Sequence, residues 1–400
     1  MKSKPPFFLT KARAPWADEN FYFKGDDYFK DVLKAIRGSK RRVDFEVYIF
    51  EKGILADRVA DALLQAAGRG VKVRLLVDGI GSPSAFADYS KKLKEGGVQF
   101  RVYRYLPSIL GWFPGLFGSL AQGKTTFRLK HFWIRFNRRN HRKLVMVDGD
   151  KVWLGGFNVS DEHLEEVSGK KAWRDTGLGL SGVRDRAFSL AFNTAWHDKN
   201  HRELWRRERR RLIAWLSRKS FSDPVHINAT HQLRQRYYRD VLDRLRGVRR
   251  RIWVTTPYFV PTRVLLRALL QAALDGRDVR LVLPEKSDIP FVRWASMTYF
   301  PRLLKAGCRI FEYHKSVLHA KTLVVDNWAM VGSSNFNHRS FLFDLEVDVV
   351  ARHSSSLKSL ERQYASDFKQ SREIHFSDLK RRSLWARCLT WIFFHARYWF

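Results

Sequence analysis

Cysteine is scarce in this chain of 400 residues, which contains only Cys308 and Cys388. The two positions are far apart in the sequence and show no metal-ligand spacing, which argues against a cysteine-based metal site. We expect two buried or unpaired thiols in a reducing compartment.

Long apolar runs are also missing. No window reaches the ~20 apolar residues that a membrane-spanning helix needs. The N-terminal segment MKSKPPFFLTKARAPW holds no apolar run long enough for a signal peptide. We therefore expect a cytoplasmic protein that does not cross a membrane.

Acidic residues are few, because 40 Asp and Glu stand against 74 Lys and Arg, and the formal net charge is +34. Such a charge favours a polyanionic partner, either nucleic acid or a membrane rich in anionic lipid. Aromatic residues are abundant, with 14 Trp and 30 Phe. That content is high for a nucleic-acid module and usual at a lipid interface. We therefore expect a peripheral protein on an anionic membrane.

The chain repeats itself. Residues 28–50, YFKDVLKAIRGSKRRVDFEVYIF, are similar to residues 237–259, YYRDVLDRLRGVRRRIWVTTPYF, at an offset of 237 − 28 = 209. Each copy reads as an amphipathic helix, a Gly stop, a basic pair and a β-rich strand. The hexapeptide ALLQAA follows in both copies, at residues 62–67 and 268–273, and precedes another strand. This order predicts α/β lobes that arose from a duplicated domain.

Each copy then contains a motif of His, any residue, Lys, four residues and Asp. The six motif residues, counted here as the catalytic motif, are His141, Lys143 and Asp148 in HRKLVMVD and His319, Lys321 and Asp326 in HAKTLVVD. The His and Lys side chains point to the same face of a strand because they are two positions apart. A Gly-rich strand follows each motif and leads to Asn158 or Asn335.

These residue types suit chemistry on a phosphodiester. The substrate is an anion, so its attack needs cationic donors such as Lys143 and Lys321 around the oxygens. Asn158 and Asn335 can add neutral donors to the same oxygens. A neutral imidazole can attack phosphorus, and a protonated one can give its proton to the leaving alkoxide. Two histidines that meet at one phosphate supply both roles.

A carboxylate behind each histidine would fix its tautomer and raise its basicity. The candidates are Asp175 in WRDTGL and Glu346 in FDLEVDVV, which each follow an Asn of the Gly-rich strand. Asp148 and Asp326 come seven residues after their His. That is too far along a strand to touch the same phosphate, so we interpret both as structural partners of strand ends or basic groups.

The paired motifs, each followed by GGFN or GSSN, resemble the phospholipase D superfamily, and KAGCRIFEYHKSVLHAKTLVVDNWAMVGSSN resembles its cardiolipin synthase branch. This resemblance implies two α/β/α lobes with mixed sheets, related by a pseudo-twofold axis, which share one active site. It covers about residues 25–380. We predict an extension at 1–24, lobes at 25–201 and 225–382, a basic linker at 202–224, and an aromatic amphipathic segment at 383–400.

The resemblance further implies a phosphatidyltransferase that needs no metal ion or other cofactor. One phospholipid, phosphatidylglycerol or phosphatidylethanolamine, would give its phosphatidyl group to His141, and His319 would protonate the departing alcohol. A second phosphatidylglycerol would then accept the group to give cardiolipin, at the cytoplasmic face of the bacterial inner membrane. A hydrolytic phospholipase D and a nucleic-acid phosphodiesterase remain alternatives, and the sequence leaves the donor, the nucleophile and the oligomeric state open.

Two segments are candidates for contact with lipid. The first lies within an insertion at about 106–139, where LPSILGWFPGLFGSL precedes a basic and aromatic band. The second is LWARCLTWIFFHARYWF from Leu384. An apolar face beside basic residues is typical of an interfacial anchor. The alternative for each segment is packing against its own lobe. The predicted contact residues are Trp112, Phe113, Leu116, Phe117, Trp385 and Trp391.

Overall fold

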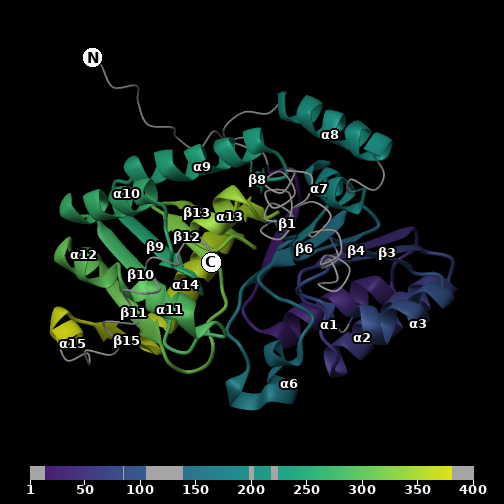
Figure 1. Cartoon of the computed structure of the whole chain (residues 1–400), viewed down its shortest axis with the longest axis horizontal. Helices are drawn as coiled ribbons and strands as arrows, with labels where there is room; N and C mark the ends of the chain where they lie inside the picture. The colour runs from purple at the N-terminus through teal and green to yellow at the C-terminus, as the bar shows by residue number, and fades with distance from the viewer. Residues whose placement is uncertain (1–13, 84, 105–137, 198–201, 218–223, 381–400) are drawn as a thin grey trace, which may run out of the picture.

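The computed structural model describes residues 14–83, 85–104, 138–197, 202–217 and 224–380. Two mixed β-sheets lie side by side and are covered by helices (Figure 1). The first lobe runs from purple to teal on the right of this view, and the second runs from green to yellow on the left. The predicted α/β fold with two mixed-sheet lobes is confirmed.

The first sheet has seven strands in the order β1-β7-β6-β5-β2-β3-β4. Their bounds are β1 Asp18–Tyr22, β2 Arg42–Val47, β3 Lys72–Asp78, β4 Gln99–Tyr103, β5 Leu144–Val147, β6 Lys151–Gly155 and β7 Gly177–Ser181. The helices of this half are α1 Gly25–Arg37, α2 Ile54–Gly68, α3 Ser90–Glu95, α6 Glu165–Ser168, α7 Ala187–Trp196 and α8 Arg202–Ser217.

The second sheet has eight strands in the order β15-β11-β10-β9-β12-β13-β14-β8. Their bounds are β8 Val225–Ile227, β9 Arg251–Thr255, β10 Asp278–Pro284, β11 Arg309–Tyr313, β12 Thr322–Val325, β13 Trp328–Gly332, β14 Val347–Val350 and β15 Ser371–Ile374. The helices are α9 His231–Arg246, α10 Arg263–Leu274, α11 Pro290–Met297, α12 Phe300–Lys305, α13 His338–Leu342, α14 Ser354–Lys369 and α15 Phe376–Lys380.

The second sheet repeats the topology of the first and adds β15 at one edge, as expected for a duplicated domain with one additional strand. In the first sheet β2, β3 and β4 are parallel, whereas β5, β6 and β7 are antiparallel to their neighbours. In the second sheet β9, β10 and β11 repeat the parallel part, and β12, β13 and β14 repeat the antiparallel part. Each motif therefore occupies the same place, on the strand that joins the two parts.

The amphipathic helices form where the sequence pattern predicts them. Tyr28, Val32 and Ile36 recur along one face of α1 and are all buried. In the second copy Thr230 caps α9, because its side chain accepts a hydrogen bond from the Leu233 backbone N–H. Lys30, Lys34 and Arg37 of α1 and Arg236, Arg239 and Arg246 of α9 are exposed, so the duplicated helices cover their sheets in the same way.

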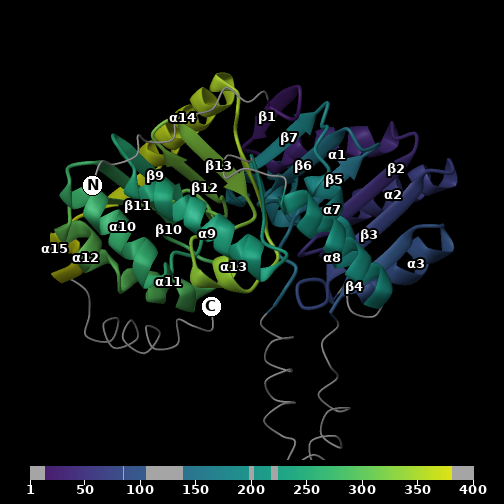
Figure 2. The same cartoon turned by 90° about the horizontal axis from the view of Figure 1, so that it is seen from above.

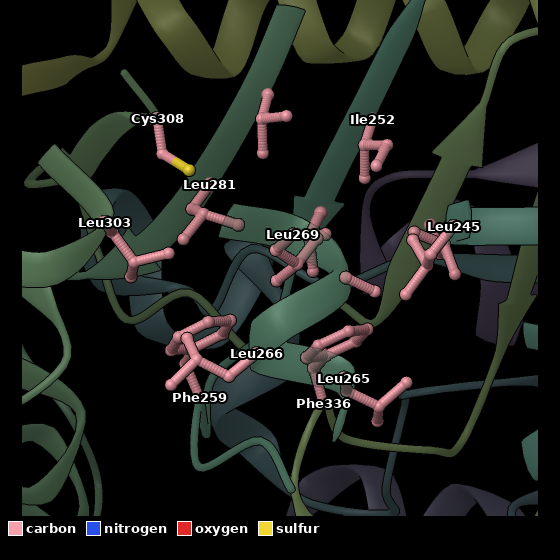
Figure 3. Packing of buried hydrophobic residues seen from close by; sticks show 14 of the residues in the cluster. Leu245, Ile252, Phe259, Leu265, Leu266, Leu269, Leu281, Leu303, Cys308 and Phe336 are labelled. Carbon is pink, nitrogen blue, oxygen red and sulfur yellow. The ribbon is translucent and has the colours of Figure 1, made fainter. Parts of the chain in front are cut away.

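The core of the second lobe shows how α10 closes over its sheet. Leu265, Leu266 and Leu269 of α10 lie near Ile252 of β9 and Leu281 of β10 in one apolar cluster (Figure 3). These leucines recur at helical spacing, so the same face of α10 contacts the sheet throughout. Burial of each such leucine contributes roughly 1.5–3 kcal/mol to the free energy of folding.

Cys308 belongs to the same core. It is buried and unpaired (Figure 3), and burial raises the pKa of its thiol to about 12. This thiol is therefore unreactive in the folded protein. Cys388 lies outside the described residues.

Two segments that the sequence places outside the lobes are structured. Residues 18–22, predicted to be part of an N-terminal extension, form the edge strand β1 of the first sheet. Glu19 on this strand accepts the Arg352 backbone N–H at 2.7 Å, so β1 also contacts the second lobe. The predicted basic linker contains helix α8. Within the described residues, no helix is both long and apolar enough to cross a membrane.

Candidate active site

Two short bridges between the lobes position the motif histidines. One pairs Asn140 with Leu345, and the other pairs Arg174 with Leu318. The His141 backbone N–H donates to the Leu345 carbonyl at 3.0 Å. In the same way the His319 backbone N–H donates to the Arg174 carbonyl at 2.8 Å. Each motif histidine is thus fixed against a segment of the opposite lobe, in two equivalent contacts.

In this arrangement each motif histidine is paired with a carboxylate from the other copy. His141 Nδ1 lies 3.1 Å from Glu346 Oε1, and His319 Nδ1 lies 2.5 Å from Asp175 Oδ2. Both predicted carboxylates therefore contact a motif histidine, each from the other copy. The pairing follows from the bridges, because Glu346 comes directly after Leu345 and Asp175 directly after Arg174.

The two histidines line a single cavity of about 860 Å³. His141 is 9% exposed and His319 is 4% exposed. Asn158 and Asn335 line the same cavity, so four of the predicted residues converge there. The wall is completed by aromatic and charged residues from both lobes, among them Tyr48, Trp173, Tyr258, Asp288, Arg339 and Asp344.

Burial sets the charge of both imidazoles. It lowers the pKa of His141 well below its usual value, with further lowering by Lys143 and Lys321. Burial followed by Lys321 also lowers the pKa of His319, and Asp175 opposes that shift. Both histidines are therefore neutral in the empty site at pH 7, which is the form that a nucleophilic imidazole needs.

The motif lysines lie directly behind the histidines. The Lys143 ammonium donates to the His141 carbonyl at 2.8 Å, and the Lys321 ammonium lies 3.2 Å from His319 Nε2. Neither lysine is part of the cavity wall in this structure. Burial and the charge of Lys321 lower the pKa of Lys143 to about 7. A phosphodiester anion between the histidines would favour the charged form of both lysines.

The two asparagines present their amides differently. The Asn158 side-chain carbonyl accepts the Ile49 backbone N–H at 3.2 Å, which leaves its amide N–H₂ as a donor. The Asn335 side-chain carbonyl is buried and has no hydrogen-bond partner among the described residues. Its backbone N–H donates to Ser340 at 3.1 Å. The Ser340 hydroxyl also donates to Glu346 at 2.7 Å, so one serine contacts both Asn335 and the Glu346 carboxylate.

Asp148 and Asp326, counted above with the catalytic motif, do not reach the cavity. Asp148 accepts the backbone N–H groups of Lys40, Arg41 and Arg42. Asp326 likewise accepts the N–H groups of three arginines, Arg249, Arg250 and Arg251. Each aspartate thereby ties the turn before β2 or β9 to the end of the motif strand. These contacts agree with the structural interpretation that their distance along the strand suggested.

His163 is a site residue that the sequence reasoning missed. It is buried, its Nε2 accepts the Asn158 backbone N–H at 3.3 Å, and its ring lies 5.9 Å from that of His319. Burial is the main reason that its pKa falls to about 3, so it stays neutral. Its position in DEH, shortly after the Gly-rich strand, was the available signal, but a lone His rarely marks a site.

Among the described residues, His163, Asp175 and His319 offer ligand atoms that lie within 4.8 Å of one another. Asp175 is already hydrogen-bonded to His319, and His163 accepts a hydrogen bond from the Asn158 backbone N–H. We interpret the group as a set of orienting contacts around His319 rather than as a metal centre.

The predicted lipid contacts lie outside the described residues. These are Trp112, Phe113, Leu116 and Phe117 in the insertion and Trp385 and Trp391 at the C-terminal end.

The fold and the cavity together define a bilobal protein with a paired-histidine site suited to phosphodiesters. The family model described as "Cardiolipin synthase, PLD-like domain" matches residues 32–168 and 241–370, one segment in each lobe. The chain belongs to this phospholipase D-like family of cardiolipin synthases.

Curated relatives extend over most of the chain. Cardiolipin synthase 2 of Bacillus cereus is 32% identical over 374 residues, which is 91% of this chain and 67% of the relative. Cardiolipin synthase of Clostridium perfringens is 30% identical and is covered over 74% of its length. Major cardiolipin synthase ClsA of Bacillus subtilis is 31% identical over 364 residues.

Solved structures agree on the fold. Phosphatidylserine synthase of Haemophilus influenzae superposes with a TM-score of 0.66 at 12% identity, covering 94% of this chain and 91% of that one. Polyphosphate kinase of Porphyromonas gingivalis gives a TM-score of 0.51 at 11% identity, covering 86% of this chain and 49% of that one. At such identities the likeness concerns the fold alone.

Proposed function

We propose that this protein is a cardiolipin synthase that transfers a phosphatidyl group from one phospholipid to the hydroxyl of phosphatidylglycerol. The observation that carries the proposal is the pair of buried imidazoles, His141 and His319, on one cavity, each held by a carboxylate from the other lobe. The cardiolipin synthases among its relatives indicate the lipid substrate.

In the first step His141 attacks phosphorus. Its Nδ1 is held by Glu346, so Nε2 carries the lone pair that forms the P–N bond. The P–O bond to the donor alcohol breaks, and His319 gives that alkoxide a proton. The phosphodiester anion and the ionised Asp175 both favour the protonated form of His319 while substrate is bound. The products are phosphatidyl-His141 and glycerol or ethanolamine.

In the second step phosphatidylglycerol enters as the acceptor. His319, now neutral, removes the proton from its hydroxyl, and the alkoxide attacks the phosphohistidine. The new P–O bond forms as the P–N bond breaks, which releases cardiolipin and restores both imidazoles. Transfer requires that water be kept from the intermediate. Trp173 and Tyr258 in the wall of the cavity support such exclusion.

We place the protein on the cytoplasmic face of the inner membrane as a peripheral enzyme. The support is its net charge of +34, which attracts anionic lipid. The same charge would also attract nucleic acid. Apolar and aromatic side chains line the cavity, including Ile49, Ile80, Trp173 and Phe291, and these favour a lipid substrate over a polynucleotide.

The test is product analysis by mass spectrometry with the purified full chain and phosphatidylglycerol vesicles. We expect cardiolipin and free glycerol. If phosphatidylethanolamine serves as donor, mixed vesicles release ethanolamine instead. Phosphatidic acid as the main product would identify a hydrolytic phospholipase D and contradict the transfer proposal. If no new lipid forms and the protein cleaves DNA or RNA, the proposed transferase activity would be wrong and the protein would be a nucleic-acid phosphodiesterase.

A further inference from the structure

A second hollow lies beside the catalytic cavity, and the chemistry described above does not use it. Its volume is about 660 Å³. The wall comes from α10, from α12 with the turn that precedes it, and from α13. We call it the α10–α13 pocket, and the lining residues that matter here are Arg263, Leu266, Arg267, Arg302, Leu342 and Phe343.

Three guanidinium groups surround this pocket without a carboxylate. Arg263 and Arg267 are one turn apart on the same face of α10, and Arg302 reaches the pocket from α12. All three are exposed. Among the described residues, none of them forms an ion pair, and no Asp or Glu lines the pocket. Nearby Arg339 differs, because Asp344 binds it at 2.9 Å.

Three like charges around one hollow repel one another unless an anion joins them. Guanidinium groups bind phosphate oxygens through paired N–H donors, which makes arginine the common choice for phosphodiesters. The three guanidinium groups give the pocket a cationic wall that is complementary to a phosphate-bearing anion.

The rim of the pocket identifies what the anion is attached to. Leu342 is 47% exposed and Phe343 is 40% exposed, and both line the pocket. Exposed apolar side chains beside a cluster of cations are typical of a surface that receives lipid. A free phosphate or a polynucleotide would leave these two side chains in water.

Helix α13 separates the pocket from the catalytic cavity. Asn337 and Arg339 line the cavity, whereas His338 and Leu342 line the pocket. Phe291 at the start of α11 lines the cavity and is 38% exposed. Helices α10, α11 and α13 lie along one edge of the molecule, and α14 lies on the opposite edge (Figure 2). Pocket and cavity are therefore neighbours on either side of α13.

We propose that the α10–α13 pocket binds the headgroup of an anionic phospholipid that is not the reacting substrate. Its phosphodiester lies among Arg263, Arg267 and Arg302, and its acyl region lies against Leu342 and Phe343. The bound lipid holds the mouth of the catalytic cavity against the bilayer. The proposal concerns lipid binding alone, so it holds whether the cavity performs transfer or hydrolysis.

The test compares two triple variants of the full chain with equal loss of charge. The first is Arg263→Gln, Arg267→Gln and Arg302→Gln. The control is a second triple at three exposed arginines outside the pocket, Arg184→Gln, Arg186→Gln and Arg362→Gln. Vesicles of phosphatidylcholine with and without phosphatidylglycerol are titrated in a flotation assay, and thermal unfolding checks that both variants are folded.

We expect the pocket variant to bind phosphatidylglycerol vesicles about tenfold or more weakly than the control variant. Both should bind pure phosphatidylcholine vesicles equally. Soluble dihexanoylphosphatidylglycerol should compete with the vesicles at concentrations where inorganic phosphate does not. A second variant, Leu342→Ser with Phe343→Ser, keeps every charge and should also weaken vesicle binding.

Equal vesicle binding by the pocket and control variants would overturn the proposal. Competition by inorganic phosphate as strong as that by the short-chain lipid would contradict it as well, because the pocket would then be a free-phosphate site. The same holds if the pocket variant loses binding to a single-stranded oligonucleotide but not to vesicles. Since the readout is binding rather than product, an inactive cavity leaves this test intact. If the triple variant does not fold, Arg302→Gln alone serves, with Arg362→Gln as its control.

Discussion

The two halves of the molecule share the strand order of the first sheet, to which the second adds β15, but they give their histidines different electrostatic surroundings. His319 is held by Asp175, whose pKa is lowered to about 2 because Lys321 and His319 outweigh the effect of burial. His141 is held by Glu346, whose pKa is raised by burial to about 7, against the influence of Lys143. At pH 7 Asp175 is therefore ionised, whereas burial favours the neutral form of Glu346.

This difference supports the two chemical roles that we propose. An ionised Asp175 favours an imidazolium at His319, which suits the residue that protonates the leaving alcohol. A weaker anion at Glu346 leaves His141 neutral, which suits the residue that attacks phosphorus. Duplication thus supplied two equivalent frames, and unequal electrostatic surroundings of the carboxylates made them different. Burial raises both pKa values, but Lys321 and His319 outweigh it at Asp175, whereas Lys143 does not outweigh it at Glu346.

The largest effect is expected from the histidines themselves. His141→Ala and His319→Ala should each lower turnover by about 10⁴-fold or more, because each removes a reacting group. The surface variant His314→Ala is the control and should retain normal activity, since this exposed residue is outside the cavity wall. Cardiolipin formation in vesicles is the measurement.

The same two variants distinguish the roles of the lobes. With a donor that carries an activated leaving group, such as p-nitrophenol, His319→Ala should still form a covalent lipid adduct at His141, because that alkoxide needs no proton. His141→Ala should form none. Mass spectrometry of the quenched protein measures the adduct, and an adduct on His319 would reverse the assignment.

The carboxylates come next. Asp175→Asn and Glu346→Gln should each slow turnover by roughly 10²- to 10³-fold, because the paired histidine loses its orienting anion. With the activated donor, Asp175→Asn should recover most of the rate of adduct formation, whereas Glu346→Gln should not. Comparing kcat for the natural and the activated donor in each variant measures this difference in recovery. Equal recovery in both variants would show that the crossed pairs do not have separate roles.

The motif lysines predict a pH dependence. The Lys143 ammonium, with its pKa near 7, loses its charge as the pH rises, so the fall in kcat/KM that follows the deprotonation of His319 should become steeper above about pH 7. Lys143→Arg keeps its charge and should move this alkaline limit upward by about one pH unit or more, even if the maximal rate is lower. A limit that stays in place would assign the titration to another group.

The smallest effect is expected far from the cavity. Asp148→Asn and Asp326→Asn each weaken three backbone hydrogen bonds to a charged acceptor, so each should lower the free energy of unfolding by about 1–3 kcal/mol. Activity per folded molecule should not change. Asp150→Asn, at an exposed position in the same turn, is the control. Thermal and urea unfolding measure the loss of stability. A change in kcat would show that these aspartates contribute to catalysis.

Much of the site was predictable because it is encoded locally. The spacing of His141 and Lys143, which directly precede β5, and the Gly-rich strand that leads to Asn158 are properties of a single chain segment. The repeat adds the second copy, and from it the paired lobes. The positions of Asp175 and Glu346 in the chain also indicated two carboxylates for two histidines.

Which carboxylate serves which histidine was not predictable from these patterns. His141 and Glu346 are 205 residues apart, and Asp175 and His319 are 144 apart. Only the bridges between the lobes bring them together. The edge strand β1 was missed for the same reason, since a short segment becomes a strand when a partner such as β7 lies beside it.

By itself, the sequence determined the duplicated α/β frame and the residues that can act on a phosphodiester, because periodicity and motif spacing are properties of one segment. The tertiary structure decided the crossed histidine pairs, their unequal charges and the arginine pocket beside α13. Those features depend on burial and on contacts between distant segments, and no local pattern specifies either.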